Sequence, residues 1–395
     1  MTERIVVVGG SVAGLRTAEA LRGLKYGGEV IVVGAEPYMP YNRTGLTKGA
    51  DWPPSFGRLR IAPKPVAEDV RWLLGVEVVH ADLARQVLEL GDGRSLEYDA
   101  LVVATGASPR RVLSEADSIV IRTLDDMRAL AGRRRGPLPV VVAGGGVLGC
   151  EIAAGLNRAG TGVVVIDRGA EPMGSMLGAR VGRRVRAFHE AAGVRFLSAT
   201  TVEDVANGPG STLVTLSNGE RLAGATVVEA LGCEPQVEWL TGNGLDLSDG
   251  VLCTNAMQVV GASNVVAAGD VARFPNPLFG GAPRRTEHWA MAMETARRAA
   301  QTVLRLLGTP FAAPASPFTP MPTFWSDQAG LRIRGVGLPR LAGRSPELLD
   351  SGVGGELYGY ADGDGLVGLC LIGYLPSFAK FSTELVACRR AAAGR

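Results

Sequence analysis

The stretch that decides the fold is IVVVGGSVAGLRTAEALRGLKYGGEVIVVGAE, residues 5–36, and it has a counterpart in VVVAGGGVLGCEIAAGLNRAGTGVVVID, residues 140–167. In each, a short β-branched run meets glycines, an Ala- and Leu-rich segment of helical periodicity follows, and a second β-branched run ends at an acid. This is the order of a strand–helix–strand unit with a right-handed crossover. The repeat predicts an α/β chain with two Rossmann-like, three-layer dinucleotide-binding domains.

The first glycine loop is Gly9-Gly10-Ser11-Val12-Ala13-Gly14. Gly9 permits the tight turn, and Gly14 lets the following helix pack closely on the strand. Ser11 stands at the position that faces a pyrophosphate, where a small residue is needed and a hydroxyl can donate a hydrogen bond. Glu36 follows Gly14 by 22 residues, where a carboxylate can accept hydrogen bonds from ribose hydroxyls. We favour a dinucleotide site over a purely structural turn.

The second loop, Gly144-Gly145-Gly146-Val147-Leu148-Gly149, matches the dinucleotide pattern at every glycine. Asp167 lies 18 residues beyond Gly149, at the end of the next predicted strand. An acid there bonds the 2′-hydroxyl of NAD and repels a 2′-phosphate. Arg168 follows directly and argues for NADP. We weigh Asp167 more heavily and predict NAD(H), with NADP(H) as the less favoured alternative. The predicted contacts are Gly144, Gly146, Val147, Leu148, Gly149, Asp167 and Arg168.

Composition limits the possible partners. The chain has 395 residues and a net charge of +2, which gives no reason to expect nucleic acid binding. We find no apolar run of membrane-spanning length and no charged-then-apolar secretory signal, so we expect a cytoplasmic protein that does not enter a membrane. The five cysteines form no Cys-x-x-Cys pair and no zinc spacing, which favours buried free thiols and no metal site.

The remaining segments predict further strands and a third region. Short apolar runs with turn signals between them are expected to form strands at 76–79, 86–90, 101–104, 194–197, 212–216 and 225–230. The Pro-rich stretch 310–322 is typical of a linker. Residues 323–395 alternate as an antiparallel sheet does, with a turn at 362–365.

Several motifs together resemble the two-dinucleotide-binding flavoprotein reductases: the two loops, Ala104-Thr105-Gly106-Ala107, Gly269-Asp270 and Glu287-His288-Trp289. Three longer stretches, VGAEPYMPYNRTGLTKG, AAGDVARF and PTFWSDQAGLRIRGVGLP, are similar to segments of the oxygenase-coupled ferredoxin reductases. This is the putidaredoxin reductase-like family of the FAD-dependent pyridine nucleotide-disulfide oxidoreductase superfamily. The resemblance covers nearly the whole chain.

The resemblance implies a domain plan and an FAD site. It implies an FAD-binding domain of residues 1–110 and 241–318, an NAD(H)-binding domain of residues 111–240, and a C-terminal α+β interface domain of residues 319–395. It also adds Glu151 and Gly232 to the NAD(H) contacts. The implied FAD contacts are Gly9, Ser11, Ala13, Gly14, Glu36, Arg43, Lys48, Val79, Ala104, Thr105, Gly106, Asp270 and Trp289.

Four of the implied residues would act at the reacting centre: Lys48, Glu151, Trp289 and Trp325. A cation at Lys48 would stabilise negative charge on reduced flavin, although a solvated loop lysine is the plain alternative. Glu151 would lie near the nicotinamide, and otherwise it is an acid in the first turn of a helix. The two tryptophans would flank the flavin, and otherwise they are core residues.

The resemblance also implies a reaction and a partner. Residues 37–56 contain no cysteine, so electrons would leave the flavin directly and not through a redox disulfide. NADH would reduce FAD, and single electrons would pass to a [2Fe–2S] ferredoxin that serves a P450 or dioxygenase. Basic candidates for docking such an acidic partner are Arg110, Arg111, Arg332 and Arg334.

Three departures from the family pattern leave the identity of the partner open. Thr44-Gly45 stands where the family has Pro-Pro, Thr47 stands for Ser, and the C-terminal segment matches the family loosely. A flavin oxidoreductase acting directly on a small molecule is therefore one alternative. A redox interaction protein like apoptosis-inducing factor is another, and the oligomeric state is left as monomer or homodimer.

Overall fold

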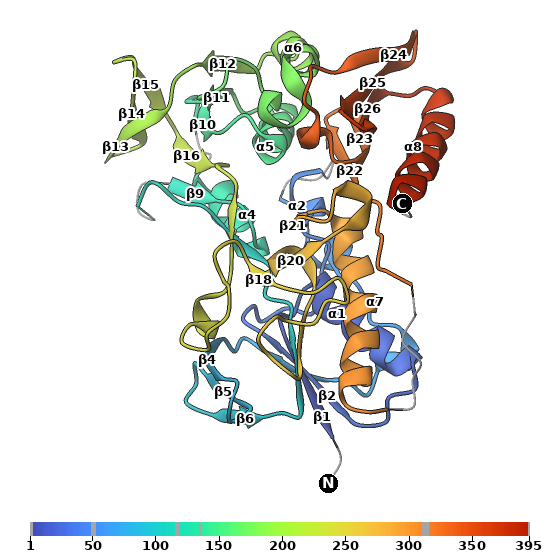
Figure 1. Ribbon diagram of the computed structural model, residues 1–395. Coiled ribbons are helices and arrows are strands. Elements are labelled where there is room, and N and C mark those ends of the chain that lie inside the picture. The colour runs from blue at the N-terminus through green and yellow to red at the C-terminus, as the bar shows by residue number, and fades with distance from the viewer. Residues whose placement is uncertain (1–2, 49–52, 115–117, 134–135, 310–315, 394–395) are drawn as a thin grey trace.

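The computed structural model describes residues 3–48, 53–114, 118–133, 136–309 and 316–393. Its framework consists of two parallel five-stranded sheets and one antiparallel five-stranded sheet (Figure 1). The α/β fold class predicted from the two glycine-loop repeats is confirmed, because each repeat supplies neighbouring parallel strands of its own sheet.

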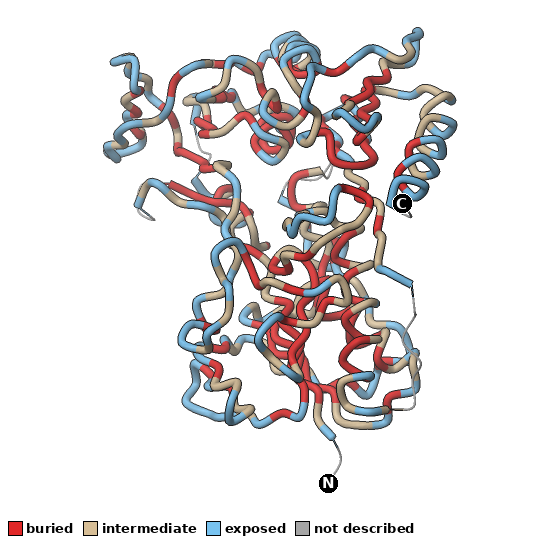
Figure 2. Tube along the Cα trace, viewed as in Figure 1, coloured by how far each residue is buried: buried red, intermediate tan, exposed pale blue. Residues whose placement is uncertain are grey.

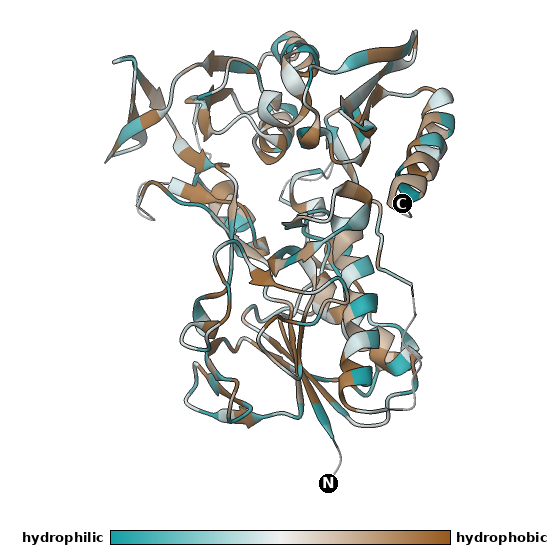
Figure 3. Ribbon diagram, in the orientation of Figure 1, coloured by the Kyte–Doolittle hydropathy of each residue, from teal (hydrophilic) through white to brown (hydrophobic). Residues whose placement is uncertain are grey.

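The first parallel sheet has the order β19-β7-β1-β2-β3. Apart from Arg4 and Glu29 at their first positions, its central strands β7, β1 and β2 are buried apolar runs, as both-face coverage of a parallel sheet requires, and they stand out as red in Figure 2 and brown in Figure 3. Helices α1 and α7 pack against each other over it. The elements are β1 (Arg4–Val8), α1 (Val12–Gly23), β2 (Glu29–Gly34), β3 (Arg71–Leu74), β7 (Ala100–Val103), β19 (Val265–Ala267) and α7 (Trp289–Leu306).

The second parallel sheet has the order β12-β11-β10-β16-β9. Helix α5 packs on its strands β10 and β11, and α6 is kinked at Gly178, whose φ is +79°. The elements are β9 (Ser118–Val120), α4 (Leu124–Arg133), β10 (Val140–Ala143), α5 (Val147–Arg158), β11 (Val163–Asp167), α6 (Gly174–Ala191), β12 (Arg195–Ser198) and β16 (Thr226–Glu229).

Two chain crossings join the parallel sheets. They pair as the antiparallel strands β8 (Ala107–Pro109) and β17 (Cys233–Pro235). Smaller three-stranded sheets are β4 (Val78–Asp82), β5 (Val87–Leu90) and β6 (Ser95–Glu97); β13 (Val202–Gly208), β14 (Ser211–Leu216) and β15 (Arg221–Gly224); and β18 (Val251–Leu252), β20 (Ala272–Pro275) and β21 (Pro283–Arg284). Short helices are α2 (Gly45–Lys48), α3 (Phe56–Leu59), η1 (Pro65–Ala67), η2 (Glu238–Leu240), η3 (Gly269–Val271) and η4 (Pro277–Phe279).

The C-terminal sheet has the order β22-β23-β26-β25-β24 and is antiparallel throughout. Its elements are β22 (Thr323–Gln328), β23 (Leu331–Gly337), η5 (Pro339–Leu341), β24 (Glu347–Gly352), β25 (Gly355–Asp362) and β26 (Gly365–Gly373). The expectation that alternation continues to residue 395 is wrong, because α8 (Ser377–Ala393) is a helix. Its Ala-rich end favours a helix. The turn predicted at 362–365 does join β25 to β26.

Strand positions agree with the sequence patterns apart from small shifts. The strand expected at 76–79 begins later, at Val78, and the short strand β6, which is not among the expected strands, lies between β5 and β7. The expected linker has no helix or strand at 316–322, while residues 310–315 lie outside the described residues. Among the described residues, no helix combines the length and apolar character needed to cross a membrane.

Candidate functional site

The two glycine loops have the same backbone construction. A Cβ on Gly9 would overlap the carbonyl of Ala104, and a Cβ on Gly144 would overlap that of Ala230. Both glycines also have positive φ, +128° and +112°. A Cβ on Gly14 or Gly149 would overlap the carbonyl oxygen of the first glycine of its own loop. Glycine is therefore required at both ends of each loop, as the tight turn and close helix packing predict.

The middle position of the loop differs from these. A Cβ on Gly146 would meet no protein atom within 4 Å, so this position faces open space. Ser11 occupies the equivalent position before α1, as its N-cap residue, and its side chain makes no capping hydrogen bond in the described structure. A small side chain is therefore accommodated here without backbone strain.

The two strand-end acids are engaged differently. Glu36 accepts hydrogen bonds from Tyr41 at 2.5 Å and from Arg43 at 2.6 Å. Asp167 accepts from the backbone amides of Gly145 and Gly169, both at 2.6 Å. Asp167 thus shapes the second loop itself, while Arg168 beside it is exposed. The sequence pattern placed both acids at strand ends but did not show these bonds.

Asp270 is brought toward the first loop by a glycine. Gly269 has a φ of +78°, and a Cβ there would lie 2.9 Å from the Cβ of Ala13, so only glycine allows this close approach. The carboxylate of Asp270 lies 3.4 Å from Arg122. The charge of Arg122, after burial as the larger cause, lowers the pKa of Arg43. The sequence gives no reason to single out Arg122. The fold places it beside Asp270 and close enough to Arg43 to lower its pKa.

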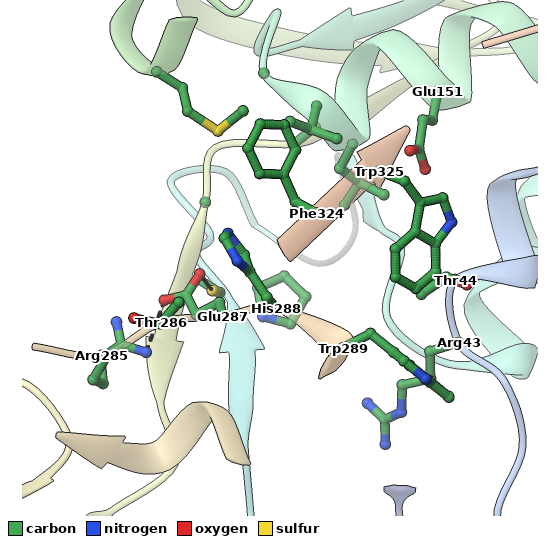
Figure 4. Close-up of a pocket in the computed structure, with 18 of the residues that line it drawn as sticks. Arg43, Thr44, Glu151, Arg285, Thr286, Glu287, His288, Trp289, Phe324 and Trp325 are labelled. Carbon is green, nitrogen blue, oxygen red and sulfur yellow. Dashed lines mark hydrogen bonds and ion pairs between the residues drawn. The ribbon is translucent and has the colours of Figure 1, made fainter. Parts of the chain in front are cut away.

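A cleft of about 620 Å³ lies where the three large sheets approach one another (Figure 4). Nine of the predicted site residues line it: Arg43, Lys48, Gly146, Val147, Leu148, Glu151, Gly232, Trp289 and Trp325. Figure 4 shows Trp325, Trp289 and Arg43 on one side of the opening and Arg285 and Glu287 on the other. The remaining predicted residues do not line it: Gly9, Ser11, Ala13, Gly14, Glu36, Val79, Ala104, Thr105, Gly106, Gly144, Gly149, Asp167, Arg168 and Asp270.

Thr105 and Gly106, which do not line the cleft, and Gly232, which does, lie where the chain crosses between the two parallel sheets. Thr105 donates to the carbonyl of Gln236 at 2.7 Å, and the carbonyl of Gly106 accepts from the amide of Gln236, so both residues clamp the crossing strands. Gly232 accepts from the amide of Arg110 at 2.9 Å. Val79 lies at an irregularity of β4 and is half exposed.

The buried Glu151 and the partly buried Lys48 form an ion pair at the wall of the cleft. Lys48 Nζ lies 3.3 Å from Glu151 Oε1, and its ammonium lies 4.9 Å from the centre of the Trp325 ring. Thr47 donates to Glu151 Oε2 at 2.7 Å, and Ser326 donates to Oε1 at 2.6 Å. Burial raises the pKa of Glu151, while Lys48 and the two hydroxyls act in the opposite direction. Two of the residues predicted to act together are thus in contact.

The opposite wall holds groups that were not assigned from the sequence. The Cys233 thiol donates to Glu287 at 3.0 Å, and Glu287 pairs with Arg285 at 2.8 Å. Burial and then Glu287 raise the pKa of Cys233 to about 12, so the thiol stays protonated. Burial and the charge of Arg340 lower the pKa of His288 to about 4, so this imidazole is neutral.

Of these groups, the motif Glu287-His288-Trp289 was recognised, but only Trp289 was named as a contact. The sequence around Cys233 and Arg122 contains no motif that indicates a functional site; each residue simply follows a short apolar run.

A second hollow, here called the basic groove, adjoins the cleft at Lys48. It measures about 410 Å³ and is lined by Lys48, Arg158, Asp327, Ala329, Gly330, Arg332 and Arg334. Arg334 pairs across the strands with Trp325, and Arg332 with Asp327. Of the four arginines predicted for a docking rim, Arg332 and Arg334 lie in this groove. Arg110 instead pairs with Glu234, and Arg111 lies 3.5 Å from Ser118.

The site residues fit two dinucleotides. The Nε atoms of Arg43 and Arg122 are buried and have no hydrogen-bond partner among the described residues. Buried donors of this kind require acceptors, which the phosphates of FAD would supply. On the other side, the open position at Gly146 and the N-terminus of α5 form an anion-binding corner of the kind that holds the pyrophosphate of NAD(H).

Known proteins resemble this chain over almost all of its length. A family model for pyridine nucleotide-disulphide oxidoreductases matches residues 3–296. The ferredoxin reductase component of chlorobenzene dioxygenase from Cupriavidus sp. (strain PS12) is 30% identical over 355 residues, which cover 85% of this chain and 81% of that protein. The crystal structure of Fdr9 superposes with a TM-score of 0.85 at 31% identity, covering 99% of this chain and 95% of that one.

The covalent complex of putidaredoxin reductase with putidaredoxin gives a TM-score of 0.86 at 27% identity, covering 98% of this chain and 93% of the matched chain. The solved structures match both glycine-loop domains and the C-terminal sheet, since they cover 98–99% of this chain. The chain belongs to the pyridine nucleotide-disulphide oxidoreductase family.

Proposed function

We propose that this chain is an FAD-dependent NADH:ferredoxin reductase that delivers single electrons to a small [2Fe–2S] protein feeding an oxygenase, either a P450 or a dioxygenase. The observation that carries the proposal is that the cofactor cleft and the basic groove meet at Lys48. The named relatives support it, because the similar Cupriavidus protein is the ferredoxin reductase component of a dioxygenase. FAD, when bound, accepts a hydride equivalent from NADH and gives up its electrons one at a time.

The proposed domain plan is supported by the late segments of the chain that rejoin the first parallel sheet. Strand β19 and helix α7 come late in sequence, yet they join the sheet and helix of the first glycine loop. We therefore assign residues 1–110 and 241–318 to FAD, residues 111–240 to NAD(H), and residues 319–395 to an interface domain. The antiparallel pair of β8 and β17 carries both crossings between the first two.

Each side chain at the cleft has a proposed task. Arg43 and Arg122 bind phosphate, and Asp270 holds the ribitol chain of FAD beside Gly269. The Lys48 ammonium places positive charge at the cofactor cleft, where negative charge develops on the reduced cofactor. Trp325 and Trp289, which line the cleft, would limit the space for the flavin and nicotinamide rings and help to exclude water.

The exit of electrons needs no cysteine. The sequence has no cysteine in residues 37–56, and Cys233 in the cleft is a protonated thiol held by Glu287. The basic groove lies next to the exposed edge of Trp325, which is 36% exposed. Clustered arginines there attract an acidic partner and orient it by charge complementarity. We therefore place ferredoxin docking on the β22–β23 hairpin.

Cytoplasmic location is part of the proposal. All five cysteines, each in a described part of the chain, are free. Free thiols, three of them buried, are typical of a protein that works in a reducing compartment.

The decisive experiment uses purified holoprotein. FAD is identified by absorbance, the flavin is reduced with NADH, and cytochrome c reduction is measured with and without an added [2Fe–2S] ferredoxin. Strong dependence on ferredoxin supports the proposal. Bleaching of the flavin without ferredoxin dependence favours an oxidoreductase that acts directly on a small molecule. Failure of NADH to bleach the flavin contradicts the proposed route of electrons into the protein.

A further inference from the structure

A buried line of polar side chains runs away from the cleft through the contact between the C-terminal sheet and the second parallel sheet. Ser326 Oγ lies 2.6 Å from Glu151 Oε1, Gln328 Nε2 lies 3.0 Å from Ser326 Oγ, and His189 Nε2 lies 2.7 Å from Gln328 Oε1. The exposed fractions of these residues are small: 4% for Glu151, 1% for Ser326, 0% for Gln328 and 1% for His189. The line therefore makes its hydrogen bonds away from water.

The two β22 residues in this line break the usual pattern of a sheet. Along β22, Trp325 and Asp327 face outward, while Ser326 and Gln328 face inward. Inward positions of a sheet normally carry apolar residues, and burying polar groups there is costly unless every hydrogen bond is made. Folding alone gives no reason for polar residues at both positions. The partners at the two ends of the line supply one.

When Glu151 is ionised, the hydrogen bonds of the line run in one direction. Ser326 has a single hydroxyl proton, and a carboxylate of Glu151 can only accept it. Ser326 Oγ therefore accepts from the Gln328 amide, whose oxygen accepts from Nε2–H of His189. Burial lowers the pKa of His189, so the ring is neutral and this tautomer carries its proton on Nε2. Every donor in the line points toward Glu151.

We propose that His189, Gln328 and Ser326 are positioning residues that hold Glu151 as a carboxylate, in register with Lys48, through this one-way line of hydrogen bonds. The line joins three parts of the molecule: α6 and α5 of the second parallel sheet, β22 of the C-terminal sheet, and α2 beside the first. Placement of the C-terminal sheet thereby sets the charge at the cofactor cleft. The inference rests on the proposed FAD and NAD(H) site but not on the identity of the electron acceptor.

Few titratable groups face Glu151 from the elements around it. Lys48 on α2 is the cation in contact with it, and His189 reaches it only through the line. Cys150, the preceding residue on α5, is a thiol whose pKa is raised by burial and by Asp167 and Glu151. Asp167, at the end of β11, is bonded to backbone amides. The ionisation of Glu151 is thus governed by Lys48, Thr47 and the line.

The test measures the pH midpoint of the visible absorption of bound oxidised flavin in the holoprotein, without turnover. The midpoint that disappears in Glu151→Gln reports this carboxyl. Removal of one hydrogen bond to a charged group in Ser326→Ala should raise that midpoint by about one pH unit, a tenfold change in proton affinity. Gln328→Met and His189→Phe should each raise the midpoint by a smaller amount, because they act through Ser326. The expected shift corresponds to a roughly threefold increase in the proton affinity of Glu151.

A double variant separates positioning from mere packing. In the Ser326→Ala background, Gln328→Met should add no further shift, since the line is already broken. His189→Gln keeps an N–H donor, so its pH midpoint should lie closer to the wild-type value than that of His189→Phe. Thr302→Val is the matched control, because it removes another hydroxyl bond of a buried residue, to the carbonyl of Ala256, and neither residue lines the cleft. It should leave the midpoint unchanged.

Three results overturn the inference: an unmoved midpoint in Ser326→Ala, a full additional shift from Gln328→Met in that background, or a flavin spectrum with no Glu151-dependent midpoint. If Ser326→Ala does not fold, Ser326→Cys carries the same test, because the thiol is a poor donor of similar shape. Protein that binds no flavin contradicts the proposed function, and the inference falls with it. A flavin-loaded protein with unmoved midpoints contradicts the inference alone.

Discussion

Replacing Lys48 by Met should make the stability of this protein more dependent on pH, through Glu151. In the wild type, burial raises the pKa of Glu151 above its unfolded value. Stability from such a group is fully present below the unfolded pKa, near 4.3, and is lost as pH rises through the folded pKa. Lys48→Met removes the opposing cation, raises the folded pKa further, and widens the range of pH over which stability is lost.

The structure allows the size of this effect to be estimated. At 3.3 Å, two unit charges interact by about 5 kcal/mol when the effective dielectric constant is about 20. This is an upper figure, since the Lys48 side chain is 14% exposed, and roughly half of it, about 2–3 kcal/mol, is expected. For a chain of this length, that corresponds to a loss of about 3 °C in Tm at pH 8 relative to pH 5.

Differential scanning calorimetry of the apoprotein at the two pH values measures this difference. The double variant Lys48→Met/Glu151→Gln should lose the extra pH dependence, because the carboxyl is gone. Lys64→Met is the matched control: Lys64 also pairs with a buried acid, Glu19, but its side chain is 65% exposed, so little change is expected. An equal drop in Tm at both pH values for Lys48→Met would refute the reasoning, because it would show loss of packing without ionisation.

Three further outcomes are expected. Asp270→Ala should yield folded protein with at least tenfold less bound FAD, measured by the ratio of visible to protein absorbance, and full flavin content would reject its assigned role. Gly146→Asp should leave Tm nearly unchanged, because a Cβ there meets no protein atom within 4 Å and Asp suits the N-cap of α5, yet raise the KM for NADH about tenfold because a carboxylate repels the pyrophosphate; an unchanged KM would place the dinucleotide elsewhere. The double variant Arg332→Glu/Arg334→Glu should raise the KM for an acidic ferredoxin more than tenfold at low salt, with the difference shrinking at high salt, whereas the exposed Arg85→Glu should not.

The sequence alone predicted the two sheets and their loops because the information is local. A β-branched run followed by Gly9 or Gly144 predicts the turn into a helix from a short segment alone. The atoms that would clash with a side chain at each glycine lie in the same loop or just after the spatially adjacent strand of the same sheet. The sequence does not indicate helix α8 because few of its residues are buried, so it has little helical periodicity of apolar side chains. Its two buried residues are Leu385 and Arg389. The alternation of apolar and polar residues in the preceding strands suggests, wrongly, that the sheet continues through these residues.

The details of the site needed contacts between distant parts of the chain. Arg122 and Asp270 are separated by 148 residues, and Glu151 and Ser326 by 175. Neither Arg122 nor Ser326 has a local signature, since an arginine after a strand and a serine within one are both ordinary. Their importance comes from the partners that the fold brings within reach, Asp270 for Arg122 and Glu151 with Gln328 for Ser326, which depend on how three sheets pack.

What the sequence by itself determined is therefore the pair of dinucleotide loops, the acids at their strand ends and the absence of a cysteine pair in residues 37–56, because each is a property of short segments. Only the tertiary structure decided that Lys48 lies against Glu151, that Asp167 bonds its own loop, and that the cleft adjoins a groove of arginines. Charges act through space, and burial strengthens their interaction, so their effect is defined only once the chain has packed.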